Sequence, residues 1–404
     1  MNLSVLQRIF LARSFRALGD GCICILLPTY LTLLGLNLVE VGWIITATVL
    51  GSGVMSLALS FHAWRWGFRV LLVCASMAMV ATGMAMTQVS EFWPLMVVGF
   101  LGTLNASMDD VSVFLPLEHA LISQSTLLHT RTRAFSRYAL VGSLVGALGA
   151  LGAQTPGWLV AQSNLDMKTA LQGMFVLYAF LGAVSALLYR GLPRNVSAQA
   201  RVAAPPLTHS RTRVVQLTAL FSIDALGGGM VVHSMMSLYL MTLFGLSVSE
   251  VSLVFLCMGM INAASFLTVP SISRSIGLLN TMLVFHVPAS LFLVAIALAP
   301  SPAWAVGFLL TRSMISSLDV PARAAYVMSL VTPDERAAAA SLTSLPRSFA
   351  TSAGPWMSGA LLTYSGFGWP LVLAGGIKLL YAALLWRGFR DVPLIDDAAA
   401  KEKL

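Results

Sequence analysis

The sequence predicts an all-α membrane protein with twelve transmembrane helices, arranged as two pseudo-symmetric six-helix bundles. Three observations lead to this fold class: the apolar composition, the spacing of long apolar stretches and an internal repeat. Of the 404 residues, 57% are hydrophobic and only 10% are charged, whereas a soluble domain carries about 25% charged residues. A lipid bilayer solvates this much apolar surface directly, which water does not.

A transmembrane helix needs roughly 20 mostly apolar residues, and twelve stretches of about this length follow one another along the chain. They lie near residues 12–35, 41–61, 70–88, 92–116, 137–154 and 170–190, and then near 214–245, 248–269, 278–299, 303–330, 339–364 and 369–387. Prolines and basic residues between the two sets indicate a solvated linker. The predicted domains are a six-helix bundle over 1–190, a cytoplasmic linker over 191–213, and a second bundle over 214–404 that ends in a short cytoplasmic tail.

Basic residues gather in every second connection. If the N-terminus is inside, the inner connections collect most arginines, among them Arg8, Arg65, Arg131 and Arg387, while the outer loops hold only Lys168 as a basic residue. Because Lys and Arg mark cytoplasmic loops, both termini are predicted to be cytoplasmic, in a cell inner membrane. The formal net charge of +8 has the same origin, so the expected partner is the lipid bilayer and not a nucleic acid.

An internal repeat divides the chain in the same way. Residues 32–41 (TLLGLNLVEV) recur as residues 242–251 (TLFGLSVSEV), and residues 100–103 (FLGT) resemble residues 308–311 (FLLT). Each copy of the longer repeat joins the first and second helices of its half. Two homologous halves predict a ligand site between them, near the middle of the membrane.

The first helix carries Leu18-Gly19-Asp20-Gly21 with Pro28 and Tyr30, and it resembles the opening of a major facilitator superfamily transporter. The connection after the second helix is similar to the superfamily motif G-x-x-x-D-R-x-G-R-R. The residues that match this motif are Arg65, Gly67 and Arg69, and those that depart from it are Ser60, Trp64 and Phe68. The resemblance implies a gating role for the three matching residues, with an inner latch that is weaker or differently built.

Glycines recur along the fifth helix, at Gly142, Gly146, Gly149 and Gly152. They are similar to the glycine-rich antiporter motif of drug and metabolite exporters, with Ala147 where a proline usually stands, and the eleventh helix carries a related arrangement at Gly354 and Pro355. The resemblance favours a bacterial exporter subset. Small residues also let helices pack closely in any membrane bundle, so packing alone explains the pattern equally well.

Carboxylates in the first half are candidates for proton or substrate binding, because a charge at membrane depth is costly and faces the bundle interior. Asp20 lies in the first helix, and Asn105, Asp109 and Asp110 lie in the fourth. Asn105 and Asp109 share a helix face. The resemblance places helices one and four along the cavity. The alternative for Asp20 is a structural pair with Arg16, one turn earlier.

The tenth helix carries Arg312, Asp319 and Arg323 in one stripe. Arg312 is a cavity candidate, whereas Asp319 and Arg323, four residues apart, are predicted to pair in the inner gate. Asp224 in the seventh helix is predicted to join an inner-gate network. His233 is a proton-relay candidate, and so is His286, although a lone helix histidine is usually hydrogen-bonded core. The sequence offers no partner for Lys378.

Together these features predict a secondary active transporter, an antiporter that couples protons to efflux of a small organic molecule by alternating access. No P-loop is present to bind ATP, and no cofactor, metal or second subunit is expected, so the transporter is predicted to act as a monomer. An importer of the same fold remains open. A polytopic membrane enzyme would need nucleophile, base or metal residues gathered at one membrane face, and the inner-face histidines fall in separate segments.

Overall fold

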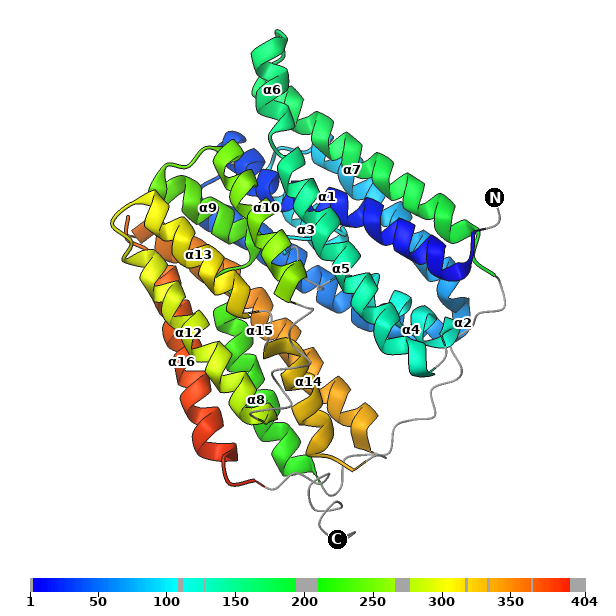
Figure 1. Ribbon diagram of the computed structural model, residues 1–404. Helices are drawn as coiled ribbons and strands as arrows, with labels where there is room; N and C mark the ends of the chain where they lie inside the picture. Colours follow the sequence, from blue (N-terminus) through cyan, green and yellow to red (C-terminus); the bar gives the residue numbers. More distant parts are fainter. Residues whose placement is uncertain are drawn as a thin grey trace. The chain divides into compact units, whose positions relative to one another are not determined.

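The structure is a computed structural model that describes residues 3–107, 112–126, 128–193, 210–265, 277–316, 319–332, 335–364 and 366–392. Every regular element in these ranges is a helix (Figure 1), which confirms the predicted all-α class. The chain forms two compact units. The first unit comprises Met1–Ala200, Val232–Ala263 and Pro355–Gly366, and the second comprises Arg201–Val231, Ala264–Gly354 and Phe367–Leu404. The predicted bundles over 1–190 and 214–404 stay a prediction.

The first unit holds most of the helices of the first half of the sequence, together with segments of the second half. Its helices are α1 (Val5–Leu33), α2 (Leu38–Gln88), α3 (Phe92–Leu101), α4 (Leu115–Ser125), α5 (Leu128–Gly152), α6 (Thr155–Gln162), α7 (Met167–Arg190), α9 (His233–Phe244) and most of α10 (Val248–Ser265). The second unit contains α8 (Arg211–Gly229), α12 (Leu278–Ala297), α13 (Pro302–Ser316), α14 (Asp319–Ser329) and α16 (Trp369–Phe389). Helix α15 (Arg336–Tyr364) is divided between the units after Gly354.

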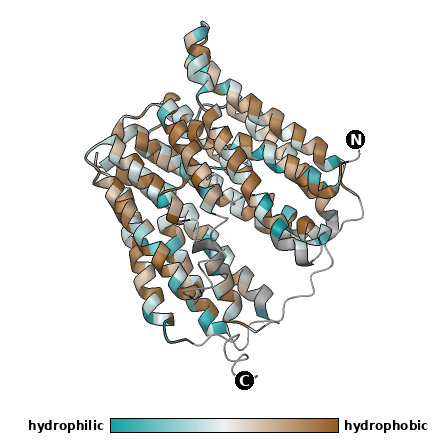
Figure 2. Ribbon diagram, viewed as in Figure 1, coloured by the Kyte–Doolittle hydropathy of each residue, from teal (hydrophilic) through white to brown (hydrophobic). Residues whose placement is uncertain are grey.

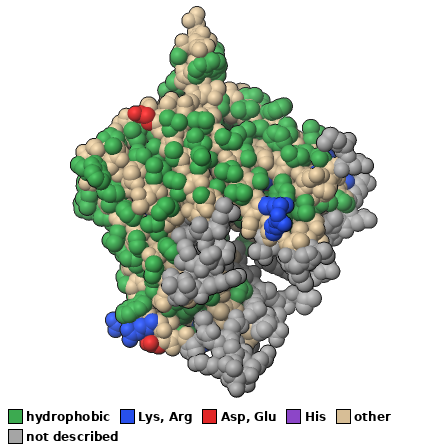
Figure 3. All heavy atoms as spheres, in the orientation of Figure 1, with side chains coloured by type: hydrophobic (Ala, Val, Ile, Leu, Met, Phe, Trp, Pro, Cys, Tyr) green, Lys and Arg blue, Asp and Glu red, His purple; other side chains and the backbone are tan. Residues whose placement is uncertain are grey.

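The described helices have the length and apolar surface expected of a membrane protein. Seven of them are long and apolar enough to cross a membrane, or up to eight spans if the pair α8 and α9, bent by 41°, is counted as one. Large apolar side chains face outward, such as Trp93 (72% exposed) and Phe180 (62% exposed). Hydrophobic residues dominate the helices in Figure 2 and the molecular face in Figure 3, where charged side chains appear at few places. Twelve spans fit this arrangement when α3 with α4, and α13 with α14, each make one crossing.

The internal repeat encodes a turn and a helix start. Gly35 and Gly245 both have left-handed backbone, with φ of 88° and 65°, which glycine adopts without steric cost. Two residues later, the side chain of Asn37 accepts a hydrogen bond from the Glu40 amide, and the Glu40 carboxylate accepts one from the Asn37 amide, both at 2.9 Å. Ser247 and Glu250 form the same reciprocal cap. These residues are repeated because each half needs a capping box at its second helix.

The connection at the worn motif is a short, sharp break. Helix α2, from Leu38 to Gln88, consists of two helices that meet at Gly67, whose φ of 73° and ψ of 152° are non-helical. The two stretches that the sequence separates, 41–61 and 70–88, therefore correspond to the two apolar spans Leu38–Leu59 and Trp66–Gln88. An L-residue with a side chain rarely adopts this conformation, so the glycine of the motif is required for the bend itself.

The predicted single helix over 92–116 is wrong. Helix α3 ends at Leu101 and α4 begins at Leu115, and residues 102–107 between them are non-helical. Hydropathy does not detect this break, because an apolar segment remains apolar when its backbone unwinds. The unwound segment needs other partners for its backbone groups, and the neighbouring helices supply them.

Glycines bring α5 against α1 within the first unit. A side chain on Gly149 would overlap the carbonyl group of Leu18, and one on Gly21 would overlap the carbonyl group of Gly146. Gly142 instead leaves room for the guanidinium group of Arg13. Nothing lies within 4 Å of the position that a Cβ would take on Gly152. Gly149 therefore permits close backbone packing and Gly142 leaves room for a buried side chain, whereas Gly152, at the end of α5, serves neither purpose.

We predict that Gly149→Ala lowers the free energy of unfolding by about 1–3 kcal/mol, because the added methyl group forces α5 away from α1. Gly152→Ala is the matched control on the same helix and should leave stability unchanged or slightly increased. Thermal unfolding of the purified protein in detergent measures both. Equal melting temperatures for the two variants would contradict the close approach at Gly149.

Candidate functional site

The unwound segment 102–107 lies inside the first unit. Thr103, Leu104, Asn105, Ala106 and Ser107 are all buried. Unpaired backbone groups at membrane depth are tolerated only where protein or a water-filled cavity surrounds them. The segment is therefore either a purely structural break in the helix or part of a binding site. Its hydrogen bonds show which of its backbone groups already have partners within the protein.

Side chains from other helices satisfy the backbone of this segment. The Thr103 amide donates to the hydroxyl of Thr82 at 3.3 Å, and the hydroxyl of Tyr178 donates to the Thr103 carbonyl at 2.7 Å. The amide of Ser234, the second residue of α9, donates to the Ala106 carbonyl at 3.0 Å. Contacts from α2, α7 and α9 thus hold the unwound backbone in one place.

Asp20 faces this segment from the middle of α1. Its carboxylate accepts a hydrogen bond from the side chain of Asn105, and it lies within electrostatic reach of Arg16 and Arg13. Asp20 is only 7% exposed. Two of the predicted cavity residues, Asp20 and Asn105, are therefore brought together, although they are far apart in sequence.

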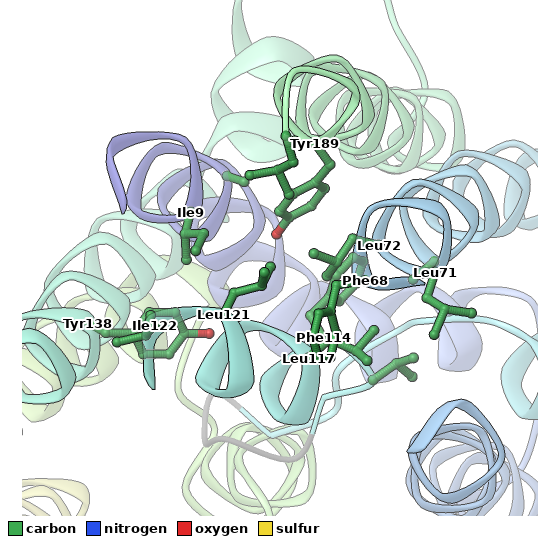
Figure 4. Packing of buried hydrophobic residues seen from close by; sticks show 14 of the residues in the cluster. Ile9, Phe68, Leu71, Leu72, Phe114, Leu117, Leu121, Ile122, Tyr138 and Tyr189 are labelled. Carbon is green, nitrogen blue, oxygen red and sulfur yellow. The ribbon is translucent and has the colours of Figure 1, made fainter. Parts of the chain in front are cut away.

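Arg16 has a different principal partner, one that the sequence did not reveal. Its guanidinium group forms an ion pair with Glu118 of α4, and both side chains are buried. The hydroxyls of Tyr138 and Tyr189 each donate to the Glu118 carboxylate at 2.6 Å. Figure 4 shows both tyrosines among the surrounding apolar residues, with their hydroxyl ends directed inward. The predicted fourth span ended at 116, so Glu118 fell just beyond it and was not considered as a candidate.

Arginines in this cluster also lie against aromatic rings. The guanidinium carbon of Arg16 is 3.9 Å from the ring centre of Phe114, and that of Arg13 is 5.1 Å from the ring centre of Tyr138. Such contacts stabilise a cation that has lost water. In this cluster Arg16 pairs with Glu118 and lies against Phe114, whereas Arg13 lies against Tyr138. Asp20 accepts a hydrogen bond from Asn105.

A second buried cluster lies in the second unit, around Asp224 of α8. Lys378 of α16 lies 2.7 Å from Asp224 Oδ1, His286 Nε2 lies 3.2 Å from the same oxygen, and Arg323 lies 2.9 Å from Oδ2. The predicted network around Asp224 therefore contains Arg323, and Lys378 has the partner that the sequence did not indicate. Arg323 lies against Asp224, whereas the side chain of Asp319 lies outside the described residues, so the predicted pair of Asp319 with Arg323 stays a prediction.

The remaining candidates are placed as follows. Arg312 is partly buried on α13 and acts electrostatically on Lys378. His233 begins α9, with its ring 5.5 Å from that of Phe255. Arg69 is partly buried on α2. Asp109, Asp110 and the side chain of Arg65 lie outside the described residues.

The family model described as Major Facilitator Superfamily matches residues 9–318. The chain belongs to the Major Facilitator Superfamily. This membership makes it a multi-pass membrane transporter and not an enzyme. It accounts for the internal repeat and for the paired helix starts described above.

Known proteins of similar sequence and structure span nearly the whole chain. "Uncharacterized membrane protein YJR124C" of Saccharomyces cerevisiae is 23% identical over 408 residues, which cover 92% of this chain and 90% of the yeast protein. The crystal structure of the nucleoside transporter NupG has a TM-score of 0.72 at 16% identity and covers 96% of this chain and 100% of its own. The D-xylose–proton symporter has a TM-score of 0.73 at 14% identity, covering 95% and 98%. At these identities the solved structures support the major facilitator fold.

We predict that Glu118→Ala destabilises the protein by about 3–5 kcal/mol, because the variant leaves the Arg16 charge buried without its carboxylate. Glu118→Gln should cost less, since its amide oxygen still accepts from a tyrosine. Glu91→Ala is the control: Glu91 is exposed and its side chain makes no cap at the start of α3. Denaturant unfolding in detergent measures all three. A Glu118→Ala variant as stable as Glu91→Ala would refute the ion pair.

Proposed function

We propose that this transporter couples proton movement to export of a small organic molecule by alternating access, as an antiporter in a cell inner membrane with both termini cytoplasmic. The observation that carries the proposal is the unwound, buried segment 102–107 beside Asp20. Broken helices in transporters lie at ligand sites near the bilayer midplane. Because the Thr103 and Ala106 backbone groups are already paired within the protein, the Asp20 side chain is the proposed binding group. A carboxylate against such a segment is suited to hold either a proton or a cationic group of the cargo.

Asp20 is the proposed proton carrier, with Asn105 as its positioning partner. The carboxylate has two arginines in electrostatic reach, so its charge changes with their distance as the helices move. Asp109 and Asp110 follow the described segment in the sequence and are proposed as further carboxylates of the site. Arg312 is proposed to hold an anionic group of the cargo, and His233 to relay protons.

Inner-gate residues complete the proposal. Gly67 supplies the kink in α2, next to Arg65 and Arg69 of the worn motif. Asp224 and Arg323 tie α8 to α14. We propose that these contacts keep the cytoplasmic ends of the helices closed while the binding site is open to the other side of the membrane. We also propose that the protein acts as a monomer, whose two six-helix bundles move during alternating access.

An importer is the second candidate, because one solved structure of similar fold is a proton symporter for D-xylose. The two candidates share the proton site and differ in the sign of coupling. An exporter exchanges cargo for protons in opposite directions, whereas a symporter moves both in the same direction. The direction of proton movement relative to cargo therefore separates them.

The test uses proteoliposomes that contain a pH-sensitive dye and a panel of probes: uridine, D-xylose, p-aminohippurate and tetraphenylphosphonium. We expect a probe gradient to drive proton movement in the opposite direction through the wild-type protein. Asp20→Asn should abolish that proton movement and leave exchange of labelled for unlabelled probe intact, because exchange does not need a net proton step. Asp166→Asn, an exposed helix cap on α7, is the control.

Three outcomes would contradict the proposal. Proton movement in the same direction as the probe identifies the importer. Transport of a probe with no proton movement refutes proton coupling, and an Asp20→Asn variant that keeps wild-type coupling refutes Asp20 as the carrier.

A further inference from the structure

We propose that His286, seated against Asp224, forms a second proton site, whose protonation loosens Arg323 and therefore helix α14. The proposal rests on the proton-coupled function above and adds to it a device in the second unit that responds to pH. In this proposal His286 binds the proton, and Asp224 is the carboxylate that His286, Lys378 and Arg323 share. Arg323 is the side chain whose contact with Asp224 weakens. Lys378 is the fixed counter-charge.

Three side-chain nitrogens lie against one carboxylate, and Lys378 Nζ donates a hydrogen bond to it. His286 Nε2 and Lys378 Nζ approach the same oxygen of Asp224, at 3.2 and 2.7 Å, while Arg323 holds the other oxygen at 2.9 Å. The side chains of Asp224, His286, Arg323 and Lys378 are 3%, 7%, 8% and 12% exposed. Water therefore does little to screen one cation from another. A change in the charge of His286 acts directly on the two neighbouring contacts.

The charged groups of this cluster come from several helices of the second unit. Helix α16 contributes Lys378 and the ring of Tyr381, 5.0 Å from the imidazole. Helix α14 contributes Arg323, and α13 contributes Arg312, which repels the charge of Lys378. Asp224 reaches the imidazole from α8. Among these described side chains only Asp224 is negative, so a proton on His286 adds a positive charge to a cluster that already holds three.

Helix α14 is the helix whose packing should loosen when His286 is protonated. It has 11 residues, whereas α16 has 21 and carries Lys378 near its middle. The Arg323 guanidinium already lies 5.3 Å from the ring centre of Phe221, which offers it a place when the carboxylate contact weakens. Tyr326 and Val327 pack α14 into the apolar core of the second unit. Protonation should therefore loosen this helix without unfolding the bundle.

Histidine is the group suited to this task, because its ordinary pKa of about 6.5 lies within the physiological range. The competing explanation is a permanent structural cluster, in which neutral His286 only donates a hydrogen bond to Asp224. Both explanations predict the same contacts. They differ in whether the stability of α14 depends on a proton added at His286.

The test is hydrogen–deuterium exchange of peptides covering residues 319–329, in the purified full-length protein at pH 5.5 and pH 8, with rates corrected for the intrinsic pH dependence of exchange. No substrate or gradient is present. We expect corrected exchange in wild-type α14 to be at least fivefold faster at pH 5.5. His286→Gln should remove this difference, because glutamine donates the hydrogen bond without taking a proton. His119→Gln, a helix histidine packed between Phe135 and Tyr138 in the first unit, should retain it.

Asp224→Asn provides a second variant that does not depend on histidine chemistry. It removes the shared carboxylate, so α14 should exchange rapidly at both pH values. Equal corrected rates for wild-type α14 at the two pH values would overturn the proposal, and so would a His286→Gln variant that keeps the wild-type pH dependence. Because exchange is measured without transport, a pH response in α14 combined with uncoupled transport would refute the proposed function alone.

Discussion

The arrangement of each unit depends on one constraint: a charge buried in a membrane bundle requires a partner from another helix. Two carboxylates satisfy it with several partners each. Glu118 on α4 contacts Arg16 of α1, Tyr138 of α5 and Tyr189 of α7. Asp224 on α8 contacts Lys378 of α16, His286 of α12 and Arg323 of α14. Removing either carboxylate leaves a buried cation, so these contacts specify which helices pack together.

The two clusters join the same kind of helices in each half, with their charges exchanged. The repeat register of 32–41 with 242–251 does not align the individual residues of the two clusters. In the first half the first helix supplies the cation and the fourth supplies the carboxylate. In the second half the first helix supplies the carboxylate, and Arg323 of the fourth supplies the cation. An ion pair therefore joins the first and fourth helices in both halves, but the cation and the carboxylate have exchanged helices. For this reason a comparison of the two halves of the sequence does not reveal it.

Local features of the fold could be predicted from the sequence, and non-local ones could not. The repeat at Gly35 and Gly245 encodes turns and caps that depend only on neighbouring residues. Spacing along one helix suggested Asp319 as a partner for Arg323, but it could not reveal the contact of Arg323 with Asp224, which lies on another helix. The break at 102–107 has no sign in hydropathy, because its compensation comes from Thr82, Tyr178 and Ser234 on other helices. Among the residues gathered around the unwound segment and Arg16, Asp20 and Asn105 were named from the sequence, whereas Glu118 was not.

The central claim is that buried carboxylates bind the helices of each unit together, and a double-mutant cycle on Asp224 and Lys378 tests it most directly. Unfolding free energies are measured for wild type, Asp224→Asn, Lys378→Met and the double variant. The exposed pair Arg390 and Asp391, 52% and 83% exposed, serves as the reference cycle. The account predicts a coupling energy of about 1–3 kcal/mol for the buried pair and a value near zero for the exposed one. Additive effects of Asp224→Asn and Lys378→Met would contradict it.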